Sequence, residues 1–145
     1  MTLLELIIAC SILIILASAA LPVARYSIIR SKETELRRDL REMKDAIDRY
    51  KDAADKNQIR VEVGSEGYPP DLETLVKGVQ LGASADKKIR FLRKIPVDPI
   101  TGQADWGLRA VQDDPDSTSW GGKNVFDVYS KSTGIALDGT KYSDW

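Results

Sequence analysis

The sequence predicts an α+β protein in which one long N-terminal helix packs on a small antiparallel sheet of about three strands. Two observations predict this architecture. An apolar segment continues into a helical pattern without any glycine up to residue 56, and short strand candidates occur only after it. The predicted regions are a hydrophobic transmembrane or assembly half-helix (1–24), an amphipathic half-helix (25–57), and a globular domain (58–145) completed by the amphipathic half-helix.

The hydrophobic half-helix carries a single ionisable side chain other than a thiol, the carboxylate of Glu5. At about 1.5 Å per residue, a helix over residues 3–24 covers the ~30 Å hydrocarbon core of a bilayer. A carboxylate left alone near the end of such a helix costs roughly 2 to 3 kcal/mol or more. Glu5 is therefore predicted to have a partner, whereas Cys10 in the same segment is interpreted as a small apolar filler.

Two simpler interpretations of this segment remain open. Residues 17–19 resemble the small-residue cleavage site of a secretory signal peptide, but no Lys or Arg precedes the apolar run and Glu5 lies where a basic region is expected. In an ordinary single-pass anchor, Arg25, Arg30 and Lys32 would hold the domain in the cytoplasm by the positive-inside tendency. Removal of a basic leader would reverse that orientation.

The amphipathic half-helix is predicted from apolar residues spaced four and three apart. Acid-before-base spacing predicts the ion pairs Glu33–Arg37 and Asp45–Arg49 on its other faces, each worth a few tenths of a kcal/mol. Pro22 removes one backbone hydrogen bond, so the helix is predicted to kink or loosen there. The predicted apolar stripe consists of Leu36, Leu40, Met43, Ile47, Tyr50 and Ala54.

Short elements are predicted beyond residue 58. An extended piece is expected at 59–63, and a short helix at 71–77 that is capped by Asp71 and stopped by Gly78. Turn chemistry at 96–102 leads into the strand candidates, which lie at residues 105–111, 125–129 and 135–137. The apolar stripe of the long helix is expected to cover the sheet that these strands form.

Composition argues against several classes of function. The chain has 21 basic and 22 acidic residues with both signs interspersed in its first half, so no basic surface indicates a nucleic-acid partner. It has no His and one Cys, which excludes thiol–imidazole dyads, His metal sites and an intrachain disulfide. No phosphate-binding loop or nucleophile–base set is present, so the chain is predicted not to be an enzyme.

Motifs along the whole chain carry a family resemblance. They are Thr2–Leu6, Pro22, Tyr68-Pro69, residues 95–102, Trp106-Gly107, Phe126–Ser130, Asp138-Gly139 and Trp145. On these residues the chain resembles the type IV pilin-like superfamily, most closely the major pseudopilins of type II secretion systems.

This resemblance implies that a prepilin peptidase removes a short basic leader and leaves Met1 as the methylated N-terminus. It also implies that Glu5 pairs with the N-terminal ammonium of a neighbouring subunit. Other implied partners are minor pilin-like subunits, an inner-membrane assembly platform, and the lipid bilayer before assembly. The implied location is the bacterial inner membrane, crossed once, with the soluble domain in the periplasm, or a periplasmic or extracellular filament.

The resemblance further implies a structural calcium ion in the C-terminal loop. The matching ligands are Asp138, Ser143 and Asp144, with a backbone carbonyl near Leu137. Ca²⁺ takes six to eight oxygen ligands, which clustered Asp, Ser and carbonyl groups can supply. A second acidic cluster, at residues 113–116, is interpreted as a solvated loop. The three tryptophans are interpreted as packing residues.

The leading hypothesis is therefore a structural subunit of a type II secretion pseudopilus, extracted from the inner membrane by an ATP-driven platform and polymerised through its N-terminal helix. The first alternative is the major subunit of an extracellular type IV-like pilus. The second is a membrane-tethered extracytoplasmic binding module, which predicts a monomer in detergent and no need for an acid at Glu5.

Overall fold

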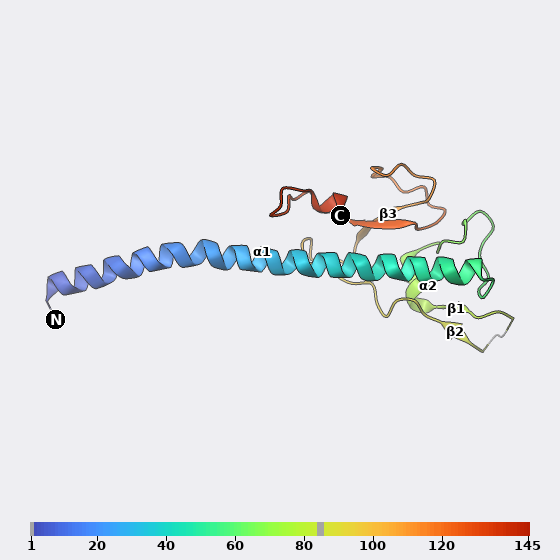
Figure 1. Cartoon of the computed structure of the whole chain (residues 1–145), viewed down its shortest axis with the longest axis horizontal. Helices are drawn as coiled ribbons and strands as arrows, with labels where there is room; N and C mark the ends of the chain where they lie inside the picture. The colour runs from blue at the N-terminus through green and yellow to red at the C-terminus, as the bar shows by residue number, and fades with distance from the viewer. Residues whose placement is uncertain (1, 84–85) are drawn as a thin grey trace.

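One helix dominates the fold, and a small domain packs around its second half (Figure 1). The computed structural model describes residues 2–83 and 86–145, and the predicted modified terminus Met1 lies outside them. The elements are α1 (Leu3–Asp55), α2 (Leu72–Lys77), β1 (Val79–Gln80), β2 (Lys88–Ile89), β3 (Trp106–Arg109), β4 (Asp127–Ser130) and the 3₁₀ helix η1 (Tyr142–Asp144). The α+β class and the long N-terminal helix are confirmed.

Helix α1 runs for 53 residues, which corresponds to about 80 Å. Thr2 is its N-cap residue, and the Thr2 hydroxyl accepts a hydrogen bond from the backbone N–H of Glu5 at 3.2 Å. The chain leaves the helix at Asn57, whose φ of 53° is left-handed. Pro22 lies inside the helix, which continues on both sides of it and bows gently along its first half in Figure 1.

The predicted apolar stripe of α1 is buried along its whole length. Its six members are 9% exposed or less, and Asp39, Ala46 and Ala53 are buried with them. Burial of a Leu, Ile or Met side chain stabilises a fold by about 1.5 to 3 kcal/mol, so this stripe is the main attachment of the domain. The first buried residue is Leu36, so the packed part of α1 begins about ten residues after the predicted boundary at residue 25.

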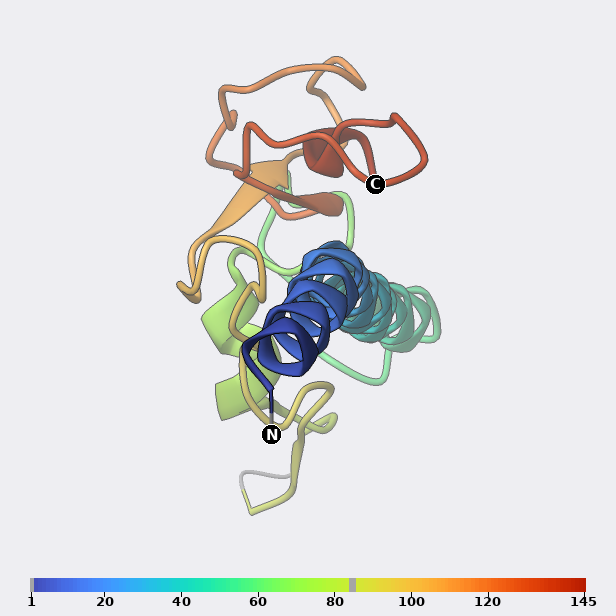
Figure 2. The ribbon, with the colours of Figure 1, turned by 90° about the vertical axis from the view of Figure 1, so that its left-hand side faces the viewer.

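The domain packs against α1 from two sides. Viewed along α1, one side holds β3, β4 and the C-terminal loop (residues 131–145), and the other side holds α2, β1 and β2 (Figure 2). The core joins the α1 stripe to both groups through Leu75 of α2, Val128 of β4 and Phe91, whose ring meets that of Tyr50 edge-on at 5.4 Å. Helix α2 has the predicted limits, with the Asp71 carboxylate accepting from Thr74 N–H at 2.7 Å and Gly78 at its C-cap.

The sheet differs from the prediction, because the described residues form two separate antiparallel pairs instead of one sheet of three strands. Strands β3 and β4 match two predicted strands and pair in the register Trp106↔Ser130 to Arg109↔Asp127. The β1–β2 pair was not predicted. The third predicted strand, 135–137, is reduced to one bridge between Ile135 and Lys141, because the chain turns back at Gly139.

The turn before β3 is built around a buried carboxylate. Asp98 is fully buried, and its Oδ1 accepts from the N–H groups of Ile100 and Thr101 at 2.8 and 3.3 Å. Its Oδ2 accepts from the hydroxyl of Ser130 at the end of β4. Trp106 fixes the same turn by donating its indole N–H to the Pro96 carbonyl at 2.9 Å. The turn at residues 96–102 is therefore held to β3 and β4 by hydrogen bonds from Trp106 and Ser130.

Candidate assembly site

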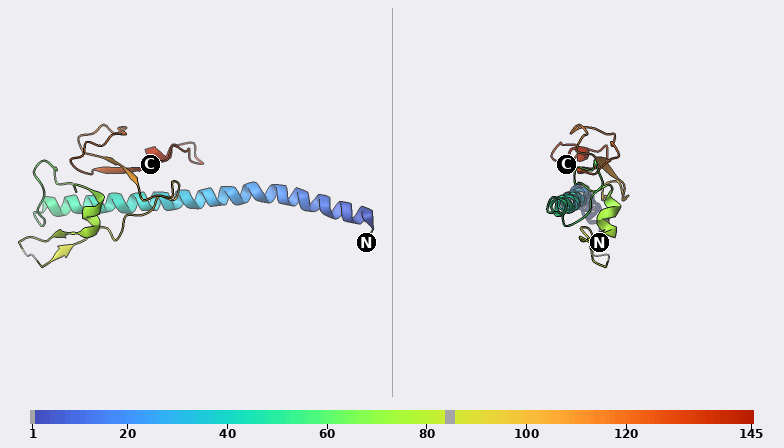
Figure 3. Two further views of the ribbon diagram at one scale, coloured as in Figure 1. Left: turned by 180° about the vertical axis from the view of Figure 1, so that it is seen from behind. Right: turned by 90° about the vertical axis from the view of Figure 1, so that its right-hand side faces the viewer.

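The N-terminal half of α1 projects beyond the domain as a bare apolar rod (Figure 3). Every residue from 2 to 32 is exposed, including all the large apolar side chains from Leu3, at 76%, to Ile29, at 38%. The helix is long and apolar enough to cross a membrane. Two serine hydroxyls of this segment are satisfied locally, since Ser11 and Ser18 donate to the carbonyls of Ile7 and Ile15 at 2.7 Å.

Glu5 lies in the first turn of this rod, on a shallow groove that it shares with Thr2, Leu4, Ile8, Ala9 and Ile12. Thr2 and Glu5 have the spacing of a capping box, and the hydrogen bond from Glu5 N–H to the Thr2 hydroxyl is half of that motif. Within residues 2–83 and 86–145, no hydrogen bond or ion pair engages the Glu5 carboxylate. Its side chain is thus open to contact from another molecule.

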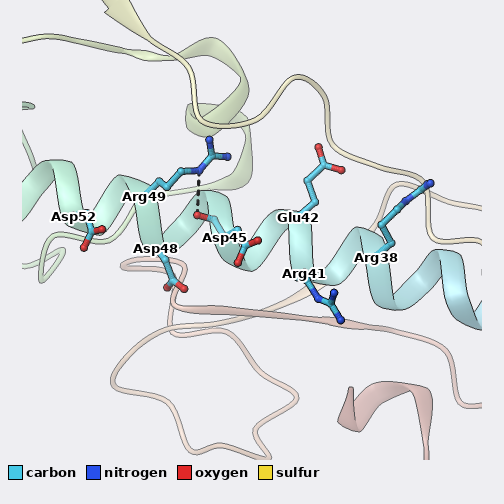
Figure 4. A pocket seen from close by; sticks show the side chains of 7 residues that line it. All are labelled: Arg38, Arg41, Glu42, Asp45, Asp48, Arg49 and Asp52. Carbon is cyan, nitrogen blue, oxygen red and sulfur yellow. Dashed lines mark hydrogen bonds between the residues drawn. The ribbon is translucent and has the colours of Figure 1, made fainter.

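Charged side chains cover the exposed face of the second half of α1 (Figure 4). The predicted ion pair between Asp45 and Arg49 is wrong. Arg49 instead donates from Nη2 to the Phe91 carbonyl at 2.6 Å, and from Nε to the Asp45 backbone carbonyl at 3.4 Å. The remaining residues that line this open face are Arg38, Arg41, Glu42, Asp48 and Asp52. The exposed apolar surface of α1 is therefore confined to its first half.

The C-terminal loop (residues 131–145) is held against α1 by two hydrogen bonds to Glu33. Its Oε1 accepts from the Leu137 N–H at 2.8 Å and from the Tyr142 hydroxyl at 2.9 Å. Burial, followed by this hydrogen bond to Glu33, raises the pKa of Tyr142 above its ordinary value of 10.0. The predicted Glu33–Arg37 ion pair is wrong, because both side chains bind the C-terminal loop instead.

Arg37 makes the second contact of α1 with the C-terminal loop. Its Nη2 lies 3.2 Å from Oδ2 of Asp138, and its guanidinium carbon lies 3.9 Å from the ring centre of Trp145. Lys44, two turns further on, approaches the Trp145 backbone oxygen at 3.4 Å and pairs with Asp127 of β4 at 3.1 Å. Sequence patterns contained no signal for these contacts, which join residues between 83 and 108 positions apart.

The three predicted calcium ligands do not line the same hollow. Asp138 and Asp144 line a groove between α1 and the C-terminal loop, whereas Ser143 lines a different hollow beside Tyr129 and Lys141. The groove also holds four cationic side chains, those of Arg37, Arg41, Lys44 and Lys141. Hydrogen bonds from Thr140 are the main cause that lowers the pKa of Asp138 below 3.8, and Arg37 adds to the shift. This arrangement does not fit a calcium ion.

The other acidic cluster stabilises a turn. One carboxylate oxygen of Asp113 accepts from the N–H groups of Ala110 and Gly121 at 2.8 and 3.0 Å, and these bonds lower its pKa below 3.8. Asp114 and Asp116 are exposed. Within the described part of the chain, no group of three or more His, Cys, Asp or Glu side chains is arranged to hold a metal ion.

Comparison with known proteins adds no relative to these observations. No protein-family model, no curated protein and no solved structure matches this chain.

Proposed function

We propose that this chain is the structural subunit of a helical type II secretion pseudopilus, held in the bacterial inner membrane and then polymerised through the first half of α1. The observation that carries the proposal is the rod of exposed apolar side chains from Leu3 to Ile29, which the chain's own domain leaves uncovered. Such a surface must be covered by lipid or by protein. A filament with these rods in its core covers it with further copies of the chain.

Apolar burial alone does not explain why copies would leave lipid for one another. Lipid tails are as apolar as the rod, so helices in a bilayer associate through packing and polar contacts instead. Glu5 is the carboxylate available for such a contact, and its side chain is exposed. In a low-dielectric filament core, its attraction to the N-terminal ammonium of a neighbouring copy is stronger than in water. This pairing would also set the axial position of each copy.

The placement of the domain supports the same assembly. The domain contacts α1 from Glu33 onward and leaves the earlier part bare. The bare segments can therefore pack side by side while the domains form the outer layer. Extraction from the membrane requires energy and an inner-membrane platform, and minor pilin-like subunits and a prepilin peptidase complete the proposed set of partners. The soluble domain would lie in the periplasm.

The experiment compares Glu5→Ala with wild type in a bacterium that carries a compatible assembly system. Filaments are sheared from the cells and measured by immunoblot and electron microscopy, and the membrane-bound pool is measured in parallel. We expect filaments to be lost while the membrane pool and the circular dichroism of the detergent-extracted chain stay unchanged. Ser11→Ala, which removes another polar side chain of the rod, should assemble normally.

Filaments of normal yield from Glu5→Ala would overturn the proposal. Long wild-type filaments outside cells would favour the extracellular type IV-like pilus. A wild-type chain that stays monomeric and never forms filaments would favour the membrane-tethered binding module.

A further inference from the structure

Four side chains of α1 and the C-terminal loop form a closed ring of contacts, and one of them is the cation Arg37. Arg37 pairs with Oδ2 of Asp138 at 3.2 Å, and Oδ1 of Asp138 accepts from the Thr140 hydroxyl at 2.6 Å and the Thr140 N–H at 2.9 Å. The same Thr140 hydroxyl accepts from the indole N–H of Trp145 at 2.7 Å. The ring closes where the Trp145 indole stacks on Arg37 at 3.9 Å.

We propose that the guanidinium of Arg37 takes the structural role of a divalent cation, so that the C-terminal loop folds on α1 without calcium. This inference concerns the stability of the subunit and does not depend on the proposed function. It identifies Arg37, on α1, as a residue that positions the loop together with Glu33.

The donor set argues against a metal ion in this groove. Calcium requires six to eight oxygens at about 2.3–2.6 Å, and its carboxylate ligands must face the ion. Both oxygens of Asp138 already have partners, and one of those partners is positively charged. A calcium ion on Asp138 would have to displace Arg37 or lie beside it, with Lys44 and Lys141 in the same groove.

The chemistry of Arg37 suits both of its contacts. A guanidinium is planar, so it can donate to a carboxylate in its plane while its face stacks on an aromatic ring. The Trp145 ring is held in place independently, because it meets the Tyr142 ring edge-on at 5.2 Å. An ammonium group has no such face, so lysine at this position would keep the charge and lose the stacking.

The ion pair by itself is a weak explanation for an ordered loop. The side chains of Arg37 and Asp138 are 55% and 50% exposed, and exposed pairs of this kind contribute little to stability. The attachment therefore depends on the combination of the pair, the stacked indole and the two hydrogen bonds to Glu33.

The first test measures the melting temperature of the full chain in detergent by tryptophan fluorescence, with calcium chloride and with EGTA. We expect the two values to agree within about 1 °C. A structural calcium ion present at about 100 times its dissociation constant would raise the melting temperature by roughly 5 °C or more. A rise of that size in the wild-type chain would overturn the proposal.

The second test compares Arg37→Ala, Arg37→Lys and the matched control Arg41→Ala, because Arg41 lines the same groove without an ion pair in the described chain. Arg37→Ala should lower the melting temperature by about 3 °C or more in both buffers. It should also speed tryptic cleavage at Lys141 several-fold. Arg37→Lys should recover less than half of either loss, and Arg41→Ala should behave as wild type.

Equal behaviour of Arg37→Ala and Arg41→Ala would overturn the role of Arg37. These measurements need no filament, so a failure here leaves the proposed function standing. Loss of filament assembly in Glu5→Ala likewise carries no information about Arg37.

Discussion

The hydroxyl of Tyr142 donates a hydrogen bond to Glu33 across 109 positions of sequence, at 2.9 Å. Glu33 also accepts from the Leu137 N–H, so a single carboxylate on α1 orders two points of the C-terminal loop. Neither Glu33 nor Tyr142 belongs to a recognisable site motif. Their pairing fixes where the loop meets the helix.

Removal of this hydroxyl tests the contact. Tyr142→Phe should destabilise the chain by about 1 kcal/mol, the typical net contribution of one hydrogen bond, because Glu33 keeps its bond from Leu137. The expected fall in melting temperature is about 2–4 °C. Tyr26→Phe is the matched control, since Tyr26 is exposed on the rod. Equal melting temperatures for the two variants would contradict the prediction.

Gly107 should not tolerate a methyl group. A Cβ at this position would lie 2.2 Å from Cζ of Tyr129, its partner across β3 and β4. The ring cannot move freely, because Arg109 stacks on it at 4.0 Å. We expect Gly107→Ala to destabilise the chain by about 1 to 3 kcal/mol through overpacking, as measured by thermal unfolding.

The cause of the Gly107 effect can be separated from backbone propensity by a double-mutant cycle. In a Tyr129→Ala background, Gly107→Ala should cost much less, because the clashing ring is absent. An unchanged cost in that background would show that the ring is not responsible.

Substitution of Asp98 should destabilise the chain more than substitution of an exposed acidic residue. Asp98→Ala removes the fully buried carboxylate that accepts from two backbone N–H groups, and it leaves the buried Ser130 hydroxyl without its acceptor. An unsatisfied buried group costs about 1 to 3 kcal/mol, so we expect a loss of roughly 2 to 3 kcal/mol. Asp116→Ala, on an exposed loop, should change the free energy of unfolding by less than about 0.5 kcal/mol. Similar losses in both variants would refute this assignment.

Asp39 should make the chain less stable as the pH rises. Burial raises its pKa above 3.8, with smaller contributions of the same sign from Glu35 and Glu42, and Arg38 opposes the shift. The folded state therefore keeps the Asp39 proton to higher pH than the unfolded state does. Between 3.8 and its folded pKa, the unfolded chain binds fewer protons, so this group lowers stability with increasing pH.

The measurement for Asp39 is the difference in melting temperature between Asp39→Asn and wild type, taken from about pH 3 to about pH 7. The melting temperature of Asp39→Asn should increase relative to that of the wild-type chain as the pH rises. Using a difference cancels the contribution of the other carboxylates. A constant difference, or one that favours wild type at higher pH, would contradict the prediction.

Sequence patterns correctly predicted the elements that depend on periodicity and capping within one segment. The apolar stripe from Leu36 to Ala54 follows helical periodicity, and Asp71 and Gly78 are the ordinary start and stop signals of a short helix. Alternation at residues 125–129 indicated β4, and the turn residues at 96–102 indicated that β3 follows them. The two-residue strands β1 and β2 have too little sequence for any period to appear.

The errors occurred where tertiary contacts replaced local ones. Glu33 and Arg37 have helical ion-pair spacing, as do Asp45 and Arg49, yet Glu33, Arg37 and Arg49 each contact a distant part of the domain. An exposed helical ion pair is worth only a few tenths of a kcal/mol, so a buried or multiple tertiary contact easily replaces it. The sequence alone identified Glu5 as unusual and placed the domain on the second half of α1, but the first buried residue, Leu36, lies about ten residues beyond the predicted boundary.

The bare rod also determines how high the domain stands above a membrane. About thirty residues precede the first contact at Glu33, or roughly 45 Å of helix, whereas the hydrocarbon core is about 30 Å thick. A spanning helix therefore lifts the domain by about two to three turns on a stalk that carries Arg25, Arg30 and Lys32. These side chains would lie among the lipid headgroups, so the domain would begin outside the hydrocarbon core of the bilayer.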